Sequence, residues 1–564
     1  MAISAAILAS VFLFGTGLRG RFVWLGSLSI PFLLLAYHWH RCLRKAQLRL
    51  RLRNGWGASV ARTRDLEEIS LHFRMTREDE DHADILDDRT WSDLDMDLIY
   101  DRLDRTLTSP GEQILYSILR RPLFETRGLE ERNRWISLIS QDRALRENLQ
   151  GILGRLGRMD GQAVTELLWS DLPKAVVPRV WVYLPLALLP VFAALAVAQQ
   201  TWAWFGLAAV FLSNMIVHFL SKRRTGDYFS SVRYLGRLIS FAKKLALLQI
   251  PEMSEQQRSL AQDAKAVSRI ARKTVYLAPG GSDPLYDYPN ILVLTEVRAF
   301  NRVLRIIEKN RPILKNIFER IGFMDAMVAI ASYRSTAGTH CRPAFVDSQP
   351  RLAFYAAVHP LLPNPVSNSF SLDESGVLVT GSNMSGKTCF LKMIGVNAIL
   401  AQTIVTCLAI KYETSFFQVK SLIGRKDNLI EGKSYYLDEI QALRRLFEPG
   451  RNSAGRLYLV DELFRGTNSA ERIAASVEVL RYLTRTLNAC IFATTHDMEI
   501  PELIGPGFIN YHFQEEIGES GIAFNYKLLT GPSTTRNAIR LLQQAGYPPE
   551  IIEAAERRIR SLSG

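Results

Sequence analysis

The sequence of 564 residues predicts an α/β domain, an all-α region before it and about four transmembrane helices. Three observations lead to this expectation. Long apolar runs occur in two closely spaced pairs, helical stretches flank the second pair, and three strand-like runs within residues 377–497 each end in polar residues. A hydrophobic content of 48% is enough to build the cores of several domains.

Charge and cysteine content limit the class of protein. The formal net charge of +13 suits a partner that carries phosphate, either nucleic acid or the anionic face of a membrane. The five cysteines form no C-x-x-C pair, so neither a disulfide framework nor a zinc site is indicated. A reduced, cytosol-facing body follows from this pattern.

The apolar runs predict two helical hairpins in a membrane. The first pair covers residues 2–18 and 22–37, and the second covers residues 180–198 and 204–220. Each run is close to the roughly 20 residues that a spanning helix needs. Two other interpretations stay open: a cleaved signal peptide for the first run, and a buried helical hairpin of a soluble domain for the second pair.

Basic residues orient these spans. A basic run at 41–53 follows the second span, and Lys222, Arg223 and Arg224 follow the fourth. By the positive-inside rule, both large soluble segments face the cytoplasm, and the chain is a multi-pass protein of the inner (cytoplasmic) membrane. Leucines interleave with the arginines in the run 41–53, so it could form a helix on anionic lipid headgroups or a nucleic-acid patch. Its position next to a membrane span favours the lipid interpretation.

A phosphate-binding loop opens the α/β domain. The stretch 381–388 reads G-x-x-x-x-G-K-T, and it lies between the strand-like Val377–Val379 and a helical stretch. Backbone N–H groups of such a loop wrap phosphate oxygens at a helix N-terminus. Lys387 is expected to neutralise the outer phosphates, and Thr388 to bind Mg²⁺.

Two further strand ends complete the expected site. "LYLV" runs into Asp461, placed to hold Mg²⁺, and Glu462, placed to polarise the attacking water. "IFATTHD" ends on His496, which is expected to sense the γ-phosphate. Parallel strands bring such ends to one edge of the sheet, and a site of this kind hydrolyses nucleotide.

Beyond these residues, the sequence resembles the MutS family. "TGSNMSGKT", "DNLIEGKSYYLDEI" and "DELFRGTNSAE" are similar to its phosphate loop, its signature segment and its DE motif, in the family's order. "HPLL" at 359–362 and "ATTHD" fit two further family motifs. The resemblance implies an ABC-type P-loop ATPase that uses ATP and Mg²⁺. It places Gly381, Asn383, Gly386, Lys387 and Thr388 on the nucleotide, Thr388 and Asp461 on the metal, and Glu462, His496 and Ser434 in catalysis.

The resemblance also implies a domain order. "LDRTLTSPGEQILYSILRRPL" at 103–123 looks like the start of the family's core domain, and residues 526–559 look like its closing helical segment. The expected domains are a transmembrane hairpin with a basic segment (1–53), a linker (54–94), a helical core with levers (95–333) interrupted by the hairpin 180–220, an ATPase domain (334–533) and a dimerisation segment (534–564).

Departures from the family pattern shape the functional hypotheses. Ser382 and Ser385 replace the usual Pro and Gly, and Val366 lies where an aromatic that stacks on adenine is expected. Nothing before residue 95 resembles the mismatch-reading domain, and the hairpin 180–220 interrupts the levers where the family carries a DNA clamp.

We therefore expect a membrane-tethered, mismatch-repair-related ATPase that acts as a homodimer and binds duplex DNA. Ser434 of each copy would complete the other copy's site. The alternative is a membrane-remodelling or transport-coupled ATPase that uses lever motion without nucleic acid. A catalytically inactive scaffold is disfavoured because Lys387, Glu462 and His496 are all present.

Overall fold

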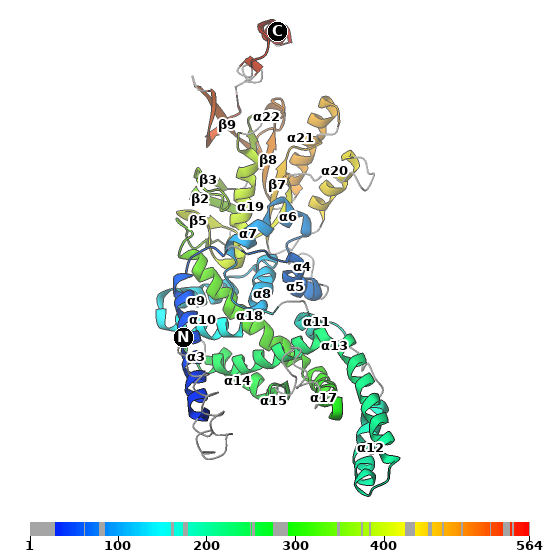
Figure 1. Cartoon of the computed structure of the whole chain (residues 1–564). Coiled ribbons are helices and arrows are strands. Elements are labelled where there is room, and N and C mark those ends of the chain that lie inside the picture. Colours follow the sequence, from blue (N-terminus) through cyan, green and yellow to red (C-terminus); the bar gives the residue numbers. More distant parts are fainter. Residues whose placement is uncertain are drawn as a thin grey trace. The chain divides into compact units, whose positions relative to one another are not determined.

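The chain folds into two compact units in a computed structural model (Figure 1). Unit 1 comprises Met1–Val60, Thr106–Pro110 and Ile139–Val328, and unit 2 comprises Ala61–Arg105, Gly111–Leu138 and Ala329–Gly564. The structure describes residues 29–60, 62–77, 85–159, 163–172, 179–248, 250, 254–274, 291–346, 350–373, 376–382, 385–423, 435–448, 454–464, 467–486, 489–518, 521–533, 542–543 and 546–562.

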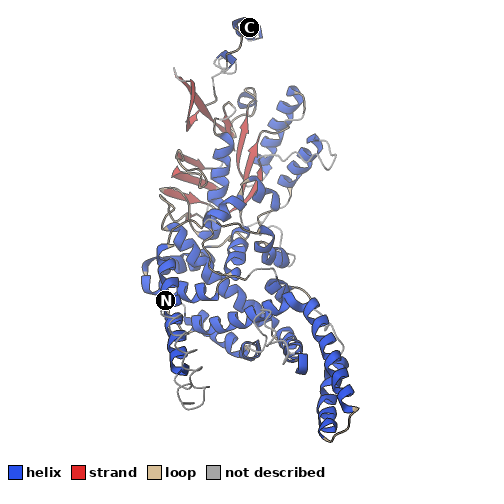
Figure 2. Cartoon of the chain, in the orientation of Figure 1, coloured by secondary structure: helices blue, strands red, loops and turns tan. Residues whose placement is uncertain are grey.

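The described part of unit 1 is helical (Figure 2). Its helices are α3 (Ser29–Asn54), α10 (Arg143–Leu156), α11 (Ala163–Trp169), α12 (Arg179–Val197), α13 (Ala203–Ala246), α14 (Ser254–Ala266), α15 (Ser268–Thr274) and α17 (Thr295–Lys309). Helix α18 (Arg311–Arg334) begins in unit 1 and ends in unit 2. The all-α region expected from the sequence is therefore present.

An exposed apolar hairpin, formed by α12 and the first half of α13, extends from unit 1. Two helical segments here, Val180–Val197 and Ala203–Ser221, are long and apolar enough to cross a membrane, and only 11% and 28% of their residues are buried. The base of the hairpin packs on unit 1, because Val182 and Val217 join a cluster with Leu294 and Val297. These segments coincide with the second predicted pair of spans.

The first predicted pair lies mostly outside the described residues. Residues 2–18 and the start of 22–37 fall there, and from Ser29 onward the chain forms α3. Two candidate spans, rather than the predicted four, are therefore found among the described residues.

The amino-terminal helices of unit 2 differ from the linker expected at 54–94. Three short helices lie in that range, and each of them buries an apolar side chain, namely Ile69, Phe73 and Trp91 in chain order. The helices in this part of unit 2 are α4 (Leu66–Ile69), α5 (Leu71–Thr76), α6 (Asp88–Asp93), α7 (Met96–Leu103), α8 (Ser109–Arg120) and α9 (Thr126–Gln141), the last two continuing into unit 1.

A six-stranded sheet forms the centre of unit 2, in the order β10-β9-β4-β8-β7-β6. Strands β9 to β6 run parallel and β10 runs antiparallel to β9. The strands are β4 (Gly376–Thr380), β6 (Phe417–Leu422), β7 (Gly455–Asp461), β8 (Ala489–Thr495), β9 (Phe508–Gly518) and β10 (Gly521–Thr530). The mixed α/β domain expected from the sequence is confirmed.

Helices cover both faces of this sheet. Successive side chains of a strand point to opposite faces, and buried apolar residues on both faces need a covering layer. On β7, Tyr458 and Val460 join the core formed with α20 and α21, whereas Leu459 contacts α19. A Cβ atom at Gly395 of α19 would lie 2.5 Å from the Leu459 side chain, so only glycine allows this close packing. The helices are α19 (Lys387–Ile404), α20 (Tyr435–Arg444), the 3₁₀ helix η4 (Arg445–Phe447), α21 (Ser469–Thr486), α22 (Ile500–Leu503) and α24 (Pro549–Leu562).

A second sheet of four strands, ordered β1-β5-β2-β3, lies in the same unit. Its strands are β1 (Ala344–Phe345), β2 (Arg351–Ala357), β3 (Asn368–Asp373) and β5 (Lys411–Thr414). The loop between β2 and β3 carries the predicted "HPLL" stretch.

Candidate functional site

Three strand ends meet at one edge of the six-stranded sheet. In the parallel register, Thr380 of β4 pairs with Thr495 of β8, and Asp461 of β7 pairs with Thr494. The residues that follow these positions therefore emerge side by side at the carboxyl edge, where ligands bind in open α/β sheets. This is the arrangement that the sequence predicted for residues 381–388, Glu462 and His496.

The loop 381–388 depends on two glycines with backbone angles that other residues rarely adopt. Gly381 has φ 145° and Gly386 has φ 106°. A Cβ atom at Gly381 would lie 2.9 Å from the backbone oxygen of Phe513, so a side chain there would displace the loop or β9. Asn383, expected on the nucleotide, lies outside the described residues.

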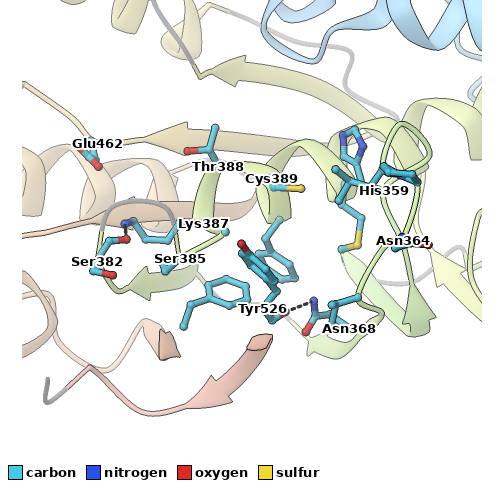
Figure 3. A pocket seen from close by; sticks show the side chains of 17 residues that line it. His359, Asn364, Asn368, Ser382, Ser385, Lys387, Thr388, Cys389, Glu462 and Tyr526 are labelled. Atoms are coloured by element: carbon cyan, nitrogen blue, oxygen red, sulfur yellow. Dashed lines mark hydrogen bonds between the residues drawn. The ribbon is translucent and has the colours of Figure 1, made fainter. Parts of the chain in front are cut away.

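Lys387 is the first residue of α19, and its side chain bends back across the loop. Its Nζ donates to the backbone oxygens of Gly381 at 2.8 Å and Ser382 at 2.9 Å (Figure 3). These contacts hold the ammonium group over the loop at the N-terminus of α19, where a helix favours negative charge. The loop therefore presents a fixed positive charge to an anion.

Asp461 and Thr388 form a pair suited to a divalent cation. The Thr388 Oγ1 donates to Asp461 Oδ2 at 3.0 Å, and Thr494 Oγ1 donates to the other carboxylate oxygen at 2.5 Å. Thr494 thus fixes the carboxylate while the pair with Thr388 remains beside the loop. Mg²⁺ prefers hydroxyl and carboxylate oxygens and takes its remaining ligands from phosphate and water, so these residues fit the metal.

Glu462 and His496 lie in direct contact beside Lys387. His496 Nε2 lies 2.6 Å from Glu462 Oε1, and Lys387 Nζ lies 3.3 Å from the same ring nitrogen. Glu462 has a positive φ of 52°, a backbone conformation that is uncommon outside glycine and recurs at functional sites. The carboxylate, the imidazole and the ammonium therefore form one chain of polar contacts at the sheet edge.

A cavity of about 540 Å³ opens next to these groups, between the loop 381–388, the β2–β3 loop and β10. Seventeen of the described residues line it, including His359, Val366, Lys387, Thr388 and Glu462. Burial lowers the pKa of His359 to about 4, so its ring is neutral at physiological pH. The cavity is large enough for a nucleotide-sized ligand.

Asn368 and Tyr526 belong to this cavity and were not singled out from the sequence. Asn368 Nδ2 donates to the Tyr526 backbone oxygen at 3.1 Å, and its Oδ1 accepts from Leu528 N at 2.9 Å, which ties β3 to β10. The Tyr526 ring lies 3.1 Å from the position of a Cβ atom at Gly386. An aromatic ring thus lies in the cavity although Val366 does not supply one.

A buried carboxylate also contacts the loop. Ser382 Oγ donates to Glu515 Oε2 at 3.0 Å, and Glu515 is only 5% exposed on β9. The sequence departs from the family pattern at Ser382, and the hydroxyl at this position gives the loop an additional support. Phe513 and Glu515 both lie on β9 of the six-stranded sheet.

The signature segment is only partly described. Ser434 lies outside the described residues, so its role stays a prediction. Glu439, five residues after Ser434 in the same segment, is 2% exposed and accepts a hydrogen bond from the backbone N–H of Phe464, just past Glu462. The end of the signature segment is thereby tied to the strand end that carries the predicted catalytic carboxylate.

A family model and individual relatives both show that this chain is similar to MutS proteins. A family model described as MutS domain V matches residues 377–563. DNA mismatch repair protein MutS of Thermus thermophilus is 25% identical over 508 residues, which cover 83% of this chain and 61% of that protein. The protein of the same name from Brevibacillus brevis is 25% identical over 517 residues, 80% of this chain and 58% of that protein.

A second kind of relative covers less of the chain. Endonuclease MutS2 of Thermus thermophilus is 29% identical over 298 residues, 50% of this chain and 38% of that protein. The chain thus spans about three fifths of the length of the mismatch repair relatives that it matches.

Proposed function

The chain belongs to the MutS family, as its motifs predicted, and on this basis we propose that it is an ABC-type P-loop ATPase anchored in a membrane. The observation that carries the ATPase proposal is the meeting of Lys387, the Thr388–Asp461 pair and the Glu462–His496 pair at one sheet edge beside the cavity. These groups supply a phosphate clamp, a metal site and a carboxylate that can activate water.

Each of these side chains has a separate part in hydrolysis. Lys387 and the loop N–H groups would hold the β- and γ-phosphates, and Thr388 and Asp461 would hold Mg²⁺, whose charge would offset that of the phosphates. Glu462 orients a water molecule for attack on the γ-phosphorus and accepts its proton, while the β–γ bridging oxygen leaves with ADP. His496, in contact with both Glu462 and Lys387, links the carboxylate to the γ-phosphate.

The cavity between the β2–β3 loop and Tyr526 is proposed to hold the adenine base. Tyr526 is 44% exposed, and its ring stands beside Gly386 at the open end of the phosphate loop. A nucleobase has a π-face that stacks on such a ring regardless of its hydrogen-bonding pattern. Tyr526 would therefore supply the stacking surface that Val366, at the position where the family resemblance places an aromatic, cannot.

We further propose a homodimer. The chain carries one phosphate loop and one signature segment, and Ser434 is assigned to the site of the second copy by the family resemblance. Helix α24 supports this assembly, because it belongs to the predicted dimerisation segment and exposes Ile551. Two equivalent sites related by a two-fold axis follow from such an exchange.

The α12–α13 hairpin supports a membrane anchor. Its distal part exposes Trp202, Trp204 and Phe205 at 53–79%, an apolar surface that no part of unit 1 covers among the described residues. Pro185 and Pro190 lie inside α12, and proline is more frequent in transmembrane helices than in soluble ones. With the basic residues that follow α13's apolar half, the ATPase would face the cytoplasm.

DNA binding is the partner activity that the name of the relatives, DNA mismatch repair protein, favours. The net charge of +13 agrees with a phosphate-bearing partner. The exposed hairpin favours the second candidate, a membrane-coupled ATPase without nucleic acid, since it occupies the part of the levers where a DNA clamp is expected. The two candidates predict different activators of hydrolysis.

One experiment addresses both points. Mg²⁺-dependent ATP hydrolysis is measured on the detergent-solubilised full chain with and without duplex DNA, at several salt concentrations, with Lys387→Ala as the inactive reference. Hydrolysis that requires Lys387 and rises with DNA in a salt-dependent manner supports the first candidate. Lys387-dependent hydrolysis that ignores DNA selects the second, and hydrolysis unaffected by Lys387→Ala contradicts the site.

A further inference from the structure

Cations from three helices of unit 1 come together without a counter-charge. They are Arg41 and Lys45 of α3, Arg155 of α10 and Lys244 of α13, and all four residues are exposed. Within the part of the chain that the structure describes, none of them forms an ion pair. Like charges repel, so such a cluster is expected to attract an anion.

The packing of α3 directs its two cations into this cluster. Arg41, Lys45, Leu48 and Leu52 follow one another at intervals of four, three and four residues, so they lie on one face of the helix. Leu48 and Leu52 pack against Gly154 of α10, where a Cβ atom would lie 3.3 Å from the Leu52 side chain. Arg41 and Lys45 continue this face beyond the contact with α10.

Helix α13 approaches the same end of α10 from its own side. Arg237 donates to the backbone oxygens of Arg155 and Leu156, and Tyr234 donates to that of Gly157 at 2.8 Å. Lys244 lies seven residues after Arg237 on the same helix face, with its Nζ 4.2 Å from the centre of the Phe241 ring. The end of α10 is therefore the meeting point of both helices.

The electrostatic environment agrees with this placement. Partial burial lowers the pKa of Lys244, and the positive charges of Arg155, Arg41 and Lys45 lower it further. A bound phosphate group would reverse the repulsive part of this effect, because each cation would then face a negative charge.

The face of α3 before the cluster indicates which kind of molecule carries the anion. Leu34 and Tyr37 precede Arg41 on the same face, and they are 62% and 65% exposed. In one stripe the helix thus passes from exposed apolar residues, through a tyrosine, to cations and then to residues packed on α10. This is the order that a helix shows where it leaves a bilayer, with aromatic residues and cations at headgroup level.

We propose that Arg41, Lys45, Arg155 and Lys244 form a binding site for the phosphate of an anionic phospholipid headgroup. Leu247, 80% exposed just after α13, adds an apolar contact beside Lys244. Nucleic acid is a weaker candidate, because its phosphates would not account for the exposed apolar stripe of α3. The inference rests on the proposed membrane attachment and names the lipid class that the attachment selects.

The test compares two double variants of the full chain in neutral detergent. Lys45→Gln/Lys244→Gln removes one cation of the site from each of α3 and α13. Arg44→Gln/Lys243→Gln removes the same charge from the neighbouring positions of the same helices. Binding of short-chain phosphatidylglycerol is measured against phosphatidylcholine with the same chains and against inorganic phosphate, and the thermal unfolding midpoint of each variant is recorded.

The site variant is expected to bind phosphatidylglycerol at least tenfold more weakly, because each cation near an anionic surface contributes about 1 kcal/mol and 1.4 kcal/mol is a factor of ten. The control variant stays within about threefold of the parent, and phosphatidylcholine binding does not change. Equal loss in both variants, or no loss in the site variant, overturns the inference. Equally tight binding of inorganic phosphate, or selective loss of duplex DNA binding instead, also overturns it.

A membrane extraction assay separates this failure from failure of the proposed attachment. If the parent chain is released from membranes by alkaline carbonate, the attachment itself is wrong and the lipid site falls with it. If the chain stays in the membrane while lipid binding ignores Lys45 and Lys244, only the lipid site is refuted.

Discussion

Replacing Tyr526 with alanine tests the proposed base pocket. The ring stands 3.1 Å from the position of a Cβ atom at Gly386, and the backbone of Tyr526 is fixed by Asn368. Because Asn368 holds only the main chain, the truncation removes the ring without moving β10. Loss of stacking costs about 1–3 kcal/mol per base, so the dissociation constant of a bound adenine nucleotide should rise by about 5- to 150-fold.

The assay is calorimetric titration of the full chain with a non-hydrolysable ATP analogue and Mg²⁺. Tyr526→Phe is the matched control, because it keeps the ring and removes only the hydroxyl, and it should bind within about twofold of the parent. Since stacking does not depend on the base edge, the guanine analogue should lose affinity by a similar factor in Tyr526→Ala. Unchanged affinity in Tyr526→Ala would refute the assignment of this cavity to the base.

Three further predictions concern other parts of the chain. Gly381→Ala should abolish nucleotide binding in the same titration while the chain remains folded by circular dichroism, because its Cβ atom would lie 2.9 Å from a backbone oxygen; parental affinity contradicts this. Burial raises the pKa of Asp325 to about 7, so the stability contributed by its neutral form is complete below pH ~4 and is lost as the pH rises through 7. Asp325→Asn should therefore make the thermal unfolding midpoint less dependent on pH between pH 5 and 8. An unchanged pH dependence would show that Asp325 is not its cause. Mixed dimers of Ser434→Ala and Lys387→Ala subunits should regain hydrolysis in one of two sites, and failure to exceed either single variant, with dimers verified, rules out the shared site.

The site residues that could be predicted from the sequence are those that a local sequence pattern marks. Asp461, Glu462 and His496 each follow an apolar strand-like run, and the ends of parallel strands necessarily meet at one edge. Asn368 and Tyr526 carry no such local signal, because their position depends on contacts between segments about 160 residues apart. The support of Ser382 by Glu515 is likewise a long-range contact across the sheet.

For the apolar helices too, the sequence predicted what local composition determines and missed what it does not. Hydropathy located the hairpin 180–220, since composition alone sets that signal, and the helices match it closely. It did not show that α13 continues as one helix to Ala246, because charged residues end an apolar run without ending a helix. The segment 54–94 was expected to be a linker, and its short helices become ordered by packing against distant parts of unit 2, as in the hydrogen bond from Ser421 N to Thr90.

Glu462→Gln tests whether this chain hydrolyses ATP at the edge of its six-stranded sheet. The substitution keeps the size of the side chain but removes the carboxylate that accepts the proton of water. Glu478→Gln, at an exposed position of α21, is the control. Single-turnover hydrolysis and ATP binding are measured on the same preparations with Mg²⁺. We expect Glu462→Gln to bind ATP within about threefold of the parent and to hydrolyse it roughly 10²–10⁴-fold more slowly, with the control unchanged. Hydrolysis by Glu462→Gln at the parental rate would show that the carboxylate does not accept the proton.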